Sequence, residues 1–329
     1  MDQSIEAIAG HSCLVTGGAG AIGSNIVRCL YGMHCSVTVL DNLSSGFRDN
    51  LADLKGIRFI HGDVRNPAHI SDALTEGPEY VFHLAAQFAN QNSVEHPITD
   101  LETNASGTVQ LLEACRKLSR LKAFVYASSS CVLGGQEGIL SETSPLRPET
   151  PYAASKLVGE FYMMLYHRLH SLPTVVIRYF NVYGPGERPG VYRNVIPNFV
   201  DRALTNKPLR ITGSGEETRE FVFVEDAVRG TILAAVVPAA HGDLFHIGSG
   251  NVIKIRDLAS RIRDLTRSNV DIEFQPRRSW DGVSMRQTSF EKARKILGYS
   301  PATSFDEGLR RTVDWIREQS VGHFTASAD

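Results

Sequence analysis

Tyr152 and Lys156, in the stretch PYAASK, have the types and spacing for proton transfer. They are four positions apart, so on a helix both side chains lie on one face. A free tyrosine has a pKa near 10, about three units too high for a base at neutral pH, but a neighbouring ammonium group favours the phenolate. Tyr152 could then take a proton from a substrate hydroxyl. Taken alone, the same spacing also fits a helix with a core tyrosine and a surface lysine.

Three serines and a cysteine follow an apolar run in the stretch YASSSCVLGG. Serine hydroxyls bond nearby backbone groups, so the end of a strand explains them. They would equally suit a proton-handling site if this turn lay beside Tyr152. The thiol of Cys131 could move a proton if its pKa were lowered, but no flanking cation in the sequence indicates this. We favour a small packing role for Cys131, as is usual for free cysteines.

The glycine-rich stretch VTGGAGAIGSN follows an apolar run and contains Gly18-x-Gly20-x-x-Gly23, with Gly17 beside it. Such glycines let the backbone approach a pyrophosphate at a helix N-terminus. Asp41 ends the next apolar run, eighteen positions after Gly23, where an acid bonds the ribose 2′-OH of NAD. No arginine immediately follows Asp41, which favours NAD over NADP. The alternative is a tight strand-to-helix turn with no ligand.

Short apolar runs alternate with helical patterns through the first half of the chain. The runs are SCLVTG, CSVTVLD, IRFIHGD, YVFHLAA, KAFVYAS and TVVIRYF. These runs are apolar at successive positions and do not alternate with polar residues, as expected for strands buried on both faces. Between the first two runs, Ile22, Ile26 and Leu30 share one helix face, and TNASGTVQLLEACRKL and PYAASKLVGEFYMMLYHRL indicate two further helices. This order predicts an α/β fold with a Rossmann-type, doubly wound parallel sheet.

The rhythm changes after about Phe180, where the Gly/Pro-rich stretch NVYGPGERPGVYRN predicts a loop. Shorter elements follow: helices are expected at 195–204, 226–236, 255–265, 290–298 and 305–318, and strands at 209–212 and 220–224. We therefore expect an NAD-binding domain over residues 1–180. Residues 181–329 are expected to form mainly a smaller C-terminal α/β substrate-binding region, with the chain crossing back to the first domain.

Composition excludes several classes of function. The 329 residues are 42% hydrophobic and 21% charged, with a net charge of −2 and no long basic stretch, which disfavours nucleic acid and anionic membranes. No apolar segment reaches the roughly 20 residues of a membrane span, and the N-terminus does not resemble a secretory signal. The five cysteines are scattered without a CxxC pair, which argues against disulfides and a zinc site. We expect a cytoplasmic protein without a metal.

The chain resembles an extended short-chain dehydrogenase/reductase of the nucleotide-sugar epimerase and dehydratase group. The resemblance rests on motifs that occur in the family's order from Ser12 to about Ile316, namely TGGAGAIG, DNLSSG, GDVRN, HLAAQ, TNASGT, ASSSCVLG, PYAASK, RYFNVYGPGERP, TREFVFVED and LGYSP. It implies NAD as cofactor and a nucleoside-diphosphate sugar as substrate. Because relatives pair through two helices, which match residues 108–118 and 156–169 here, it also implies a homodimer.

The resemblance assigns roles to individual residues. Ser129 would bond the reacting sugar hydroxyl, Tyr152 would be the base, and Lys156 would assist it and hold the nicotinamide ribose. Cofactor contacts are implied for Tyr152, Lys156 and Gly17, Gly20, Ala21, Ile22, Asp41, Asn42, Ser45, Gly46, Asp63, Val64, Leu84, Ala85, Ala86, Asn104 and Tyr179. Substrate contacts are implied for Gln87, Ser129, Ser130, Cys131, Asn181, Arg188, Asn194, Val195, Arg219, Arg278 and Asp281.

The family's reactions share oxidation of the sugar at C4 by NAD. Dehydratases then need an acid and a base just after the active Ser/Thr, where this chain has Ser130 and Cys131. We therefore expect a nucleotide-sugar 4-epimerase, acting on a UDP-sugar, in which the keto-sugar turns over and takes the hydride back on its other face. The alternatives are a dehydratase or another 4-keto-sugar enzyme using Cys131, and a non-catalytic NAD-binding protein.

Three positions bear on the choice of substrate. Leu133 replaces the family's Tyr in VYG, and Glu220 replaces its Asp in TRD. Arg188, in GPGERP, could lie near the C5 substituent of the sugar. One hypothesis is that Arg188 binds a carboxylate, which would make the substrate a uronate. The alternative is a contact with the diphosphate or within the loop.

Overall fold

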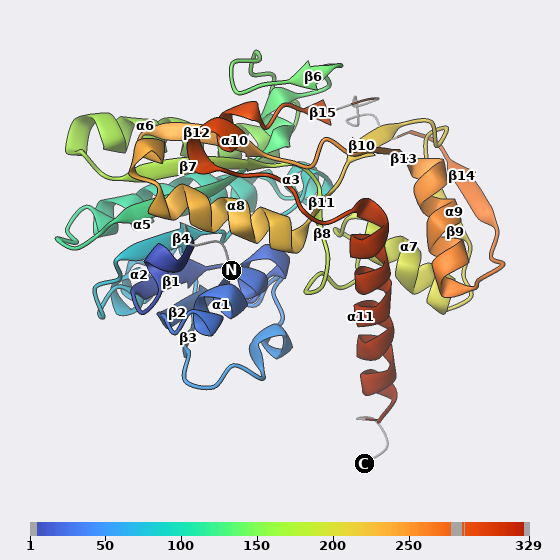
Figure 1. Cartoon of the computed structure of the whole chain (residues 1–329), viewed down its shortest axis with the longest axis horizontal. Helices are drawn as coiled ribbons and strands as arrows, with labels where there is room; N and C mark the ends of the chain where they lie inside the picture. The colour runs from blue at the N-terminus through green and yellow to red at the C-terminus, as the bar shows by residue number, and fades with distance from the viewer. Residues whose placement is uncertain (1–4, 278–284, 286, 326–329) are drawn as a thin grey trace.

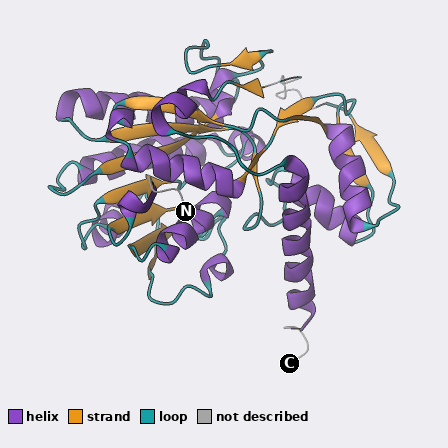
Figure 2. Cartoon of the chain, in the orientation of Figure 1, coloured by secondary structure: helices purple, strands orange, loops and turns teal. Residues whose placement is uncertain are grey.

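A seven-stranded parallel sheet forms the centre of the protein (Figures 1 and 2). The computed structural model describes residues 5–277, 285 and 287–325. The strand order β12-β7-β5-β4-β1-β2-β3 is joined by parallel pairs throughout. The strands are β1 Ser12–Thr16, β2 Ser36–Asp41, β3 Arg58–His61, β4 Tyr80–His83, β5 Ala123–Ser129, β7 Thr174–Tyr179 and β12 Asp243–Ile247. The Rossmann-type sheet expected from the six apolar runs is confirmed.

Helices cover both faces of the sheet. Helices α1 (Ala21–Gly32) and α8 (Val224–Val236) bury one face in a large apolar cluster. The other face is covered by α2 (Pro67–Ala73), α5 (Gly107–Cys115) and α6 (Pro151–His170). Adjacent strand residues alternate between the two clusters, which is why the apolar runs are continuous in sequence.

The second half of the chain contributes both to the central sheet and to a smaller group of helices and strands beside it. Helix α8 and strand β12 return to the central sheet, where β12 pairs with β7. Helices α7 (Val195–Leu204), α9 (Ile255–Thr266) and α11 (Phe305–Thr325) pack beside β9 (Leu209–Thr212) and β14 (Ile272–Gln275) at the far end of the molecule (Figure 1). The bounds expected for α7 and β9 are confirmed, whereas the expected strand 220–224 is divided between two short strands.

The remaining elements are short and position loops. They are helices α3 Asn90–Glu95, α4 Pro97–Leu101 and α10 Glu291–Leu297, and strands β6 Ile139–Leu140, β8 Val182–Tyr183, β10 Thr218–Glu220, β11 Val222–Phe223, β13 Val252–Lys254 and β15 Gln287–Thr288. A π-helical turn, Glu102–Ser106, joins α4 to α5. Most of these were not predicted, because runs of two to six residues carry too little periodicity.

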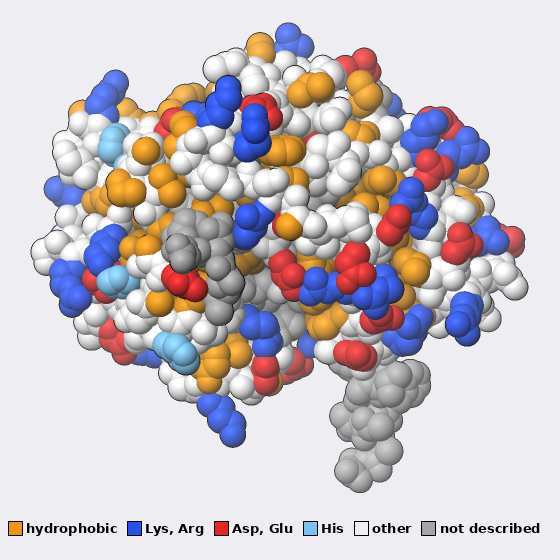
Figure 3. Space-filling model, viewed as in Figure 1, with side chains coloured by type: hydrophobic (Ala, Val, Ile, Leu, Met, Phe, Trp, Pro, Cys, Tyr) orange, Lys and Arg blue, Asp and Glu red, His pale blue; other side chains and the backbone are white. Residues whose placement is uncertain are grey.

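The surface agrees with the near-neutral composition. On the face shown in Figure 3, acidic and basic side chains lie next to one another. Many of them form exposed ion pairs, such as those of Arg311 with Glu225 and of Arg261 with Asp306. Within the described residues, none of the helices is long and apolar enough to cross a bilayer.

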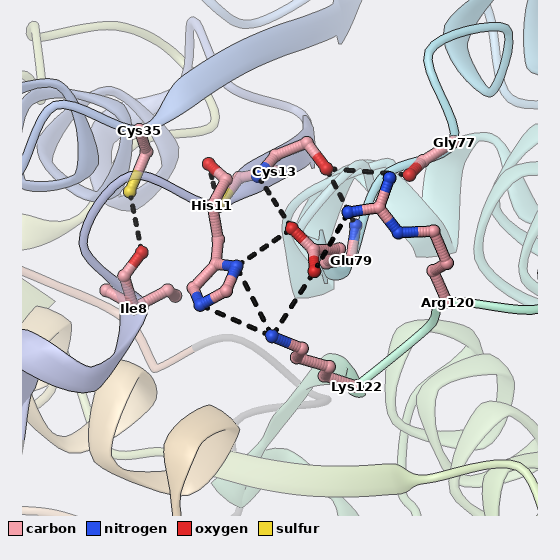
Figure 4. Close-up of polar contacts among 9 residues, drawn as sticks. Ile8, His11, Cys13, Cys35, Gly77, Glu79, Arg120 and Lys122 are labelled. Carbon is pink, nitrogen blue, oxygen red and sulfur yellow. Dashed lines mark hydrogen bonds and ion pairs between the residues drawn. The ribbon is translucent and has the colours of Figure 1, made fainter.

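Glu79 organises the edge of the sheet at which the strands begin (Figure 4). This buried carboxylate accepts a hydrogen bond from His11 Nδ1 at 2.8 Å and lies 3.2 Å from Lys122 Nζ and 3.4 Å from Arg120 Nη2. It also accepts from the backbone N–H of Ser12 at 3.4 Å. These partners, His11 foremost, lower the pKa of Glu79 to about 2. The carboxylate thus joins the starts of β1, β4 and β5.

Glu79→Gln is expected to flatten the acid dependence of stability. Because the pKa of Glu79 is lowered on folding, its contribution is full above the ordinary pKa near 4.3 and is lost as the pH falls toward about 2. The expected loss is on the order of 1–2 kcal/mol, since the exposed partners Lys122 and Arg120 are screened by solvent. Urea unfolding at pH 2–6 measures it. Equal acid slopes for the two proteins would contradict this role.

Candidate active site

A cavity of about 670 Å³ lies where the parallel strands end. Its lining includes the turn after β1, the ends of β2, β4 and β5, the start of α6 and segments from the second half of the chain. The predicted residues that line it are Gly17, Gly20, Ala21, Ile22, Asp41, Asn42, Ser45, Gly46, Asp63, Val64, Leu84, Ala85, Ala86, Gln87, Ser129, Ser130, Cys131, Tyr152, Lys156, Tyr179, Asn181, Asn194, Val195 and Arg219. One cavity therefore brings the predicted cofactor, catalytic and substrate residues together.

The turn between β1 and α1 is closed tightly by glycine. Gly17 has a φ of +69°, in the left-handed region, and a Cβ on it would lie 2.6 Å from Ala85 N. A Cβ on Gly23 would collide with the carbonyl oxygen of Gly17. Residues 20–23, at the start of α1, therefore line the cavity, and a helix N-terminus in this place suits a pyrophosphate.

Asp41 lies at the end of β2 with both carboxylate oxygens already oriented. Oδ2 accepts from Ala19 N at 2.8 Å, and Oδ1 accepts from Leu43 N at 2.8 Å. Burial raises the pKa of Asp41, and these two hydrogen bonds oppose that rise. Each oxygen can still accept a bond from a ribose hydroxyl. A carboxylate in this place suits NAD and disfavours the 2′-phosphate of NADP.

Asp63 completes the same end of the cavity. It accepts from Asn42 Nδ2 at 2.8 Å and from Arg65, whose guanidinium and backbone lower the pKa of Asp63 to about 2. The Arg65 guanidinium is thus already paired with the Asp63 carboxylate, and this pairing disfavours its use as a phosphate ligand. The residues present here fit a dinucleotide without a 2′-phosphate.

Thr150 and Pro151 begin helix α6 and thereby place the catalytic pair. Thr150 Oγ1 accepts from Ala153 N at 3.2 Å and donates to Asn90 Oδ1 at 2.9 Å. Proline in the first helical turn needs no N–H partner there. Tyr152 and Lys156 follow on one face of the helix, and both line the cavity.

Lys156 is held as a buried cation. It is 2% exposed, and its Nζ donates to Ala127 O at 2.9 Å and lies 5.9 Å from the centre of the Tyr152 ring. Burial lowers the pKa of Lys156 to about 8, while the carboxylates of Asp100 and Glu160 act in the opposite direction. The ammonium group therefore stays largely protonated near neutral pH.

Tyr152 differs from the expectation for an isolated Tyr-Lys pair. Burial raises the pKa of Tyr152 well above its ordinary value; Cys131 and Asp100 raise it further, and a hydrogen bond with Ser129 opposes them. The protein groups alone thus favour the neutral phenol, because burial penalises the phenolate most. A second positive charge close to the hydroxyl is needed before Tyr152 becomes an effective base.

Ser129 has two roles at the end of β5. Its hydroxyl accepts from Cys131 N at 3.2 Å, which caps the 3-10 helix Ser130–Leu133, and it also bonds with Tyr152. Ser129 therefore both bonds the backbone at the end of a strand and lies beside the proposed base, as the two interpretations of the sequence each required. The next side chains differ in exposure: Ser130 is buried and Cys131 is half-buried, with its Sγ 3.5 Å from Asn90 Nδ2.

Asn104 lies behind the cavity instead of lining it. Its Oδ1 accepts from Gln87 N at 2.8 Å, and its Nδ2 donates to Asp100 Oδ2 at 2.8 Å and to Ser155 Oγ at 3.1 Å. Asn104 thereby holds the loop after β4 against helix α6. The structure thus gives Asn104 a supporting position, with a fully buried side chain outside the cavity lining.

A buried ion pair anchors helix α6 to the sheet. Glu160 lies one turn beyond Lys156; its Oε1 accepts from Arg178 Nε at 2.8 Å and its Oε2 from Arg178 Nη2 at 2.6 Å. Ser128 Oγ donates to Glu160 Oε1 at 2.6 Å. Both charged side chains are at most 4% exposed. The pair fixes the catalytic helix against β5 and β7, next to Ser129.

The substrate side of the cavity is organised by Glu220. This buried carboxylate accepts from the backbone N–H groups of Ser249, Gly250 and Thr288 at 2.7, 2.9 and 2.5 Å. Its own carbonyl oxygen accepts from Asn181 Nδ2 at 2.8 Å. Glu220 does not line the cavity, so the departure from the family's Asp affects the support of β10 rather than a direct contact.

Arg188 does not lie at the cavity. Its Nη2 is 3.2 Å from Asp49 Oδ2, and its guanidinium stacks 4.4 Å from the centre of the Phe47 ring. The arrangement matches the loop-contact alternative, so Arg188 is not carried forward as the ligand of a sugar carboxylate. Two further predicted substrate residues, Arg278 and Asp281, lie outside the described residues.

The lining residues that sequence reasoning did not assign include Glu187, Arg193, Asn90 and Thr150. Glu187 and Arg193 come from the Gly/Pro-rich loop before α7, and Asn90 comes from the short helix α3. Loops carry no periodic signal, so these residues could not be assigned. Thr150 was detectable, since Thr-Pro before an apolar helix is an N-cap pattern.

The sheet, the glycine turn and the Tyr-Lys pair at one cavity define a short-chain dehydrogenase/reductase of the extended type. Residues 13–248 match the model of the NAD dependent epimerase/dehydratase family. The chain belongs to this family, which confirms the resemblance found in its motifs.

Named relatives cover almost the whole chain. The UDP-glucose 4-epimerase of Mycolicibacterium smegmatis is 36% identical over 93% of this chain and 99% of its own length. An epimerase structure from Methanothermobacter thermautotrophicus is 41% identical, with a TM-score of 0.92 over 98% of this chain and 97% of that one. The UDP-glucose 4-epimerase of Thermotoga maritima, solved with UDP-glucose, is 34% identical, with a TM-score of 0.89 over 94% and 99%.

Proposed function

We propose that this protein is an NAD-dependent nucleotide-sugar 4-epimerase that acts on a UDP-sugar. The observation that carries the proposal is the cavity that joins the glycine turn, Ser129, Tyr152 and Lys156, with no carboxylate directly after Ser129. The family assignment and the relatives named UDP-glucose 4-epimerase support it.

The side chains would divide the work as follows. NAD, when bound, supplies the acceptor of the hydride from sugar C4 and a positive ring. Tyr152 takes the proton of the C4 hydroxyl, and Lys156 stabilises the phenolate through its charge. Ser129 positions that hydroxyl through a hydrogen bond. Return of the proton from Tyr152 restores the alcohol, so the protein ends each cycle unchanged.

The predicted cofactor and substrate contacts are part of this proposal. The glycine turn and Asp41 would hold the pyrophosphate and ribose, and Asn194, Val195 and Arg219 would hold the substrate diphosphate. Their positions in one cavity support these assignments. An arginine suits phosphate oxygens because its planar fork can donate two hydrogen bonds.

Epimerisation is favoured over dehydration by the residues after Ser129. Eliminating water requires an acid and a base beside the oxidised sugar, and Ser130 and Cys131 are a hydroxyl and a thiol. The lining carboxylate nearest this turn in sequence, Glu149, accepts from Gly135 N at 3.1 Å. Cys131, held by Asn90, would therefore act as a packing residue that leaves room for the sugar to turn.

Reaction in heavy water distinguishes the two chemistries. With UDP-glucose we expect UDP-galactose and no deuterium bonded to carbon, because the C4 hydrogen returns as a hydride. Proton NMR and mass spectrometry of the recovered sugars measure this. Deuterium at C5 or C6, or a 6-deoxy-4-keto product, would assign the protein to the dehydratases instead.

We further propose a cytoplasmic homodimer formed through α6 and its neighbour α4. Phe161 and Leu169 on α6 are 52% and 64% exposed, and Ile98 and Leu101 on α4 are 67% and 52% exposed. The two helices pack together, and both expose large apolar side chains. Exposed apolar side chains gathered on neighbouring helices are common at protein interfaces. Helix α5, which was expected to share the interface, shows no exposed large apolar side chain.

Phe161→Glu is expected to convert the dimer to a monomer, because a charge would be buried at its centre. Sedimentation velocity at several concentrations measures the mass. Phe274→Glu, at an equally exposed position on the distant strand β14, should leave the dimer intact. A wild-type protein that sediments only as a monomer would contradict the proposal.

A further inference from the structure

Glu187 is a buried carboxylate in the cavity that the proposed reaction does not use. It lies in the loop between β8 and α7, is 4% exposed and lines the cavity. In the described structure it forms no ion pair within 4 Å. A buried carboxylate without a bonded cation is costly to keep charged, and this makes its protonation state sensitive to nearby charge.

The hydrogen bonds to Glu187 come from the start of helix α7. Its Oε1 accepts from Asn194 Nδ2 at 2.8 Å and from Asn194 N at 3.3 Å. Asn194 precedes the first residue of α7, so the carboxylate occupies the positive end of that helix. Asn194 is also a proposed contact of the substrate diphosphate. The Glu187 carboxylate and the substrate diphosphate would therefore both contact Asn194.

The loop that carries Glu187 is held by contacts with neighbouring segments. Gly186 packs on the first turn of α1, where a Cβ would lie 3.1 Å from Ala21 O. Asn50 Nδ2 donates to Gly186 O at 3.0 Å, and Asn25 Nδ2 donates to Pro185 O at 2.8 Å. The Glu187 backbone is thus fixed between the glycine turn and α7.

Nearby cations compensate Glu187 only in part. Arg193 is the charged group that acts on it, but the Arg193 guanidinium donates to Ser45 O and lies 5.7 Å from the centre of the Phe47 ring. Arg188, the next residue in the chain, faces Asp49. Burial raises the pKa of Glu187 to about 7, with Asn194 and Arg193 opposing the rise.

We propose that Glu187 takes up a proton when the nucleoside-diphosphate sugar binds, so that the incoming phosphate charge meets a neutral carboxyl group. The proposal rests on the proposed function. The two negative charges of the diphosphate disfavour a carboxylate beside them, and protonation removes that charge while a carboxyl oxygen can still accept from Asn194 Nδ2. Glu187 therefore acts as a positioning residue for the diphosphate through Asn194.

Proton uptake makes substrate affinity depend on pH. Above pH 7 the free protein must first bind a proton, so the affinity for the sugar nucleotide falls, by up to about tenfold per pH unit. The pH dependence of substrate binding should therefore be observed in KM or Kd. The rate at saturating substrate should follow the Tyr152-Lys156 pair instead, because the bound state already carries the proton.

Calorimetry of the NAD-saturated protein tests this directly. UDP-glucose is titrated at pH 7.5 in two buffers of different ionisation enthalpy, since its diphosphate does not titrate near neutrality. We expect uptake of about 0.5 to 1 proton per site by the wild-type protein. Glu187→Gln should take up none and bind with an affinity that is flat from pH 6.5 to 8.5. Asp201→Asn, which removes a carboxylate two turns into α7, should behave as the wild type.

The outcomes separate this inference from the proposed function. Absence of binding by UDP-glucose and the other UDP-sugars would contradict the proposed function. Binding without proton uptake, or equal uptake by Glu187→Gln, would overturn the inference alone. Proton uptake when NAD binds the NAD-free protein, with none when UDP-glucose binds, would link the proton to the cofactor and not to the substrate. This result would also overturn the inference. Glu187→Ala serves as the second variant if the first does not fold.

Discussion

Tyr152→Phe is expected to lower kcat by about 10³-fold while leaving KM within a few-fold. The phenol hydroxyl is the only atom removed, and it is the group proposed to take and return the proton of the C4 hydroxyl. Tyr152 is buried at the cavity beside Lys156 and bonds Ser129, so the ring should stay in place. Coupled assay of UDP-glucose and UDP-galactose interconversion measures the rate.

The control lies on the same helix. Tyr162→Phe removes a hydroxyl from a partly exposed ring of α6 and should retain wild-type kcat. NAD binding to Tyr152→Phe, followed by fluorescence or calorimetry, should also be retained, which separates catalysis from cofactor loss. Undiminished activity of Tyr152→Phe would remove the catalytic assignment, and inactivity of the wild type toward every sugar nucleotide would favour a non-catalytic NAD-binding protein.

Breaking the Glu160–Arg178 pair is expected to cause the largest loss of stability. Glu160→Ala leaves the fully buried Arg178 guanidinium without its carboxylate, and such broken pairs cost about 3–5 kcal/mol. The neighbouring His246 can accept from Arg178 Nη1 at 3.5 Å but supplies no negative charge, because burial, followed by the charge of Arg178, lowers its pKa to about 3 and keeps it neutral. Guanidinium unfolding followed by circular dichroism measures the difference.

Two comparisons distinguish charge from packing. Glu160→Leu combined with Arg178→Met should recover much of the stability, since apolar side chains of similar volume can replace a buried pair. Arg116→Ala removes an exposed partner of Glu113 on α5 and should cost far less, because exposed ion pairs contribute little to stability. A Glu160→Ala protein as stable as the wild type would show that the pair does not anchor α6.

The central sheet was predictable because its signal is local. Each of six apolar runs became a strand, and their alternation with helices predicted that the strands pair in parallel. Strand β12 was missed although its five residues are largely apolar, because a run of that length does not distinguish a strand from a buried helix segment. Its place at the sheet edge depends on pairing with β7, more than sixty residues earlier.

The site was predictable where chemistry is carried by short motifs. The glycine turn, Asp41, Ser129, Tyr152 and Lys156 follow strand ends or share one helix face, and the cavity contains all of them. Arg188 and Glu187 show the limit of this reasoning. They are neighbours in an aperiodic loop, yet Arg188 faces Phe47 and Asp49 while Glu187 faces the cavity.

The fold class, the family and the residues proposed to transfer the proton could be predicted from sequence, because motif spacing and apolar periodicity are properties of neighbouring residues. The electrostatics of the site depend on the tertiary structure. It buries Tyr152 so that its pKa rises, holds Lys156 near Asp100, pairs Glu160 with Arg178 and leaves Glu187 without a bonded cation. These charge states depend on burial and on the distances between segments far apart in the chain, and neither can be predicted from neighbouring residues.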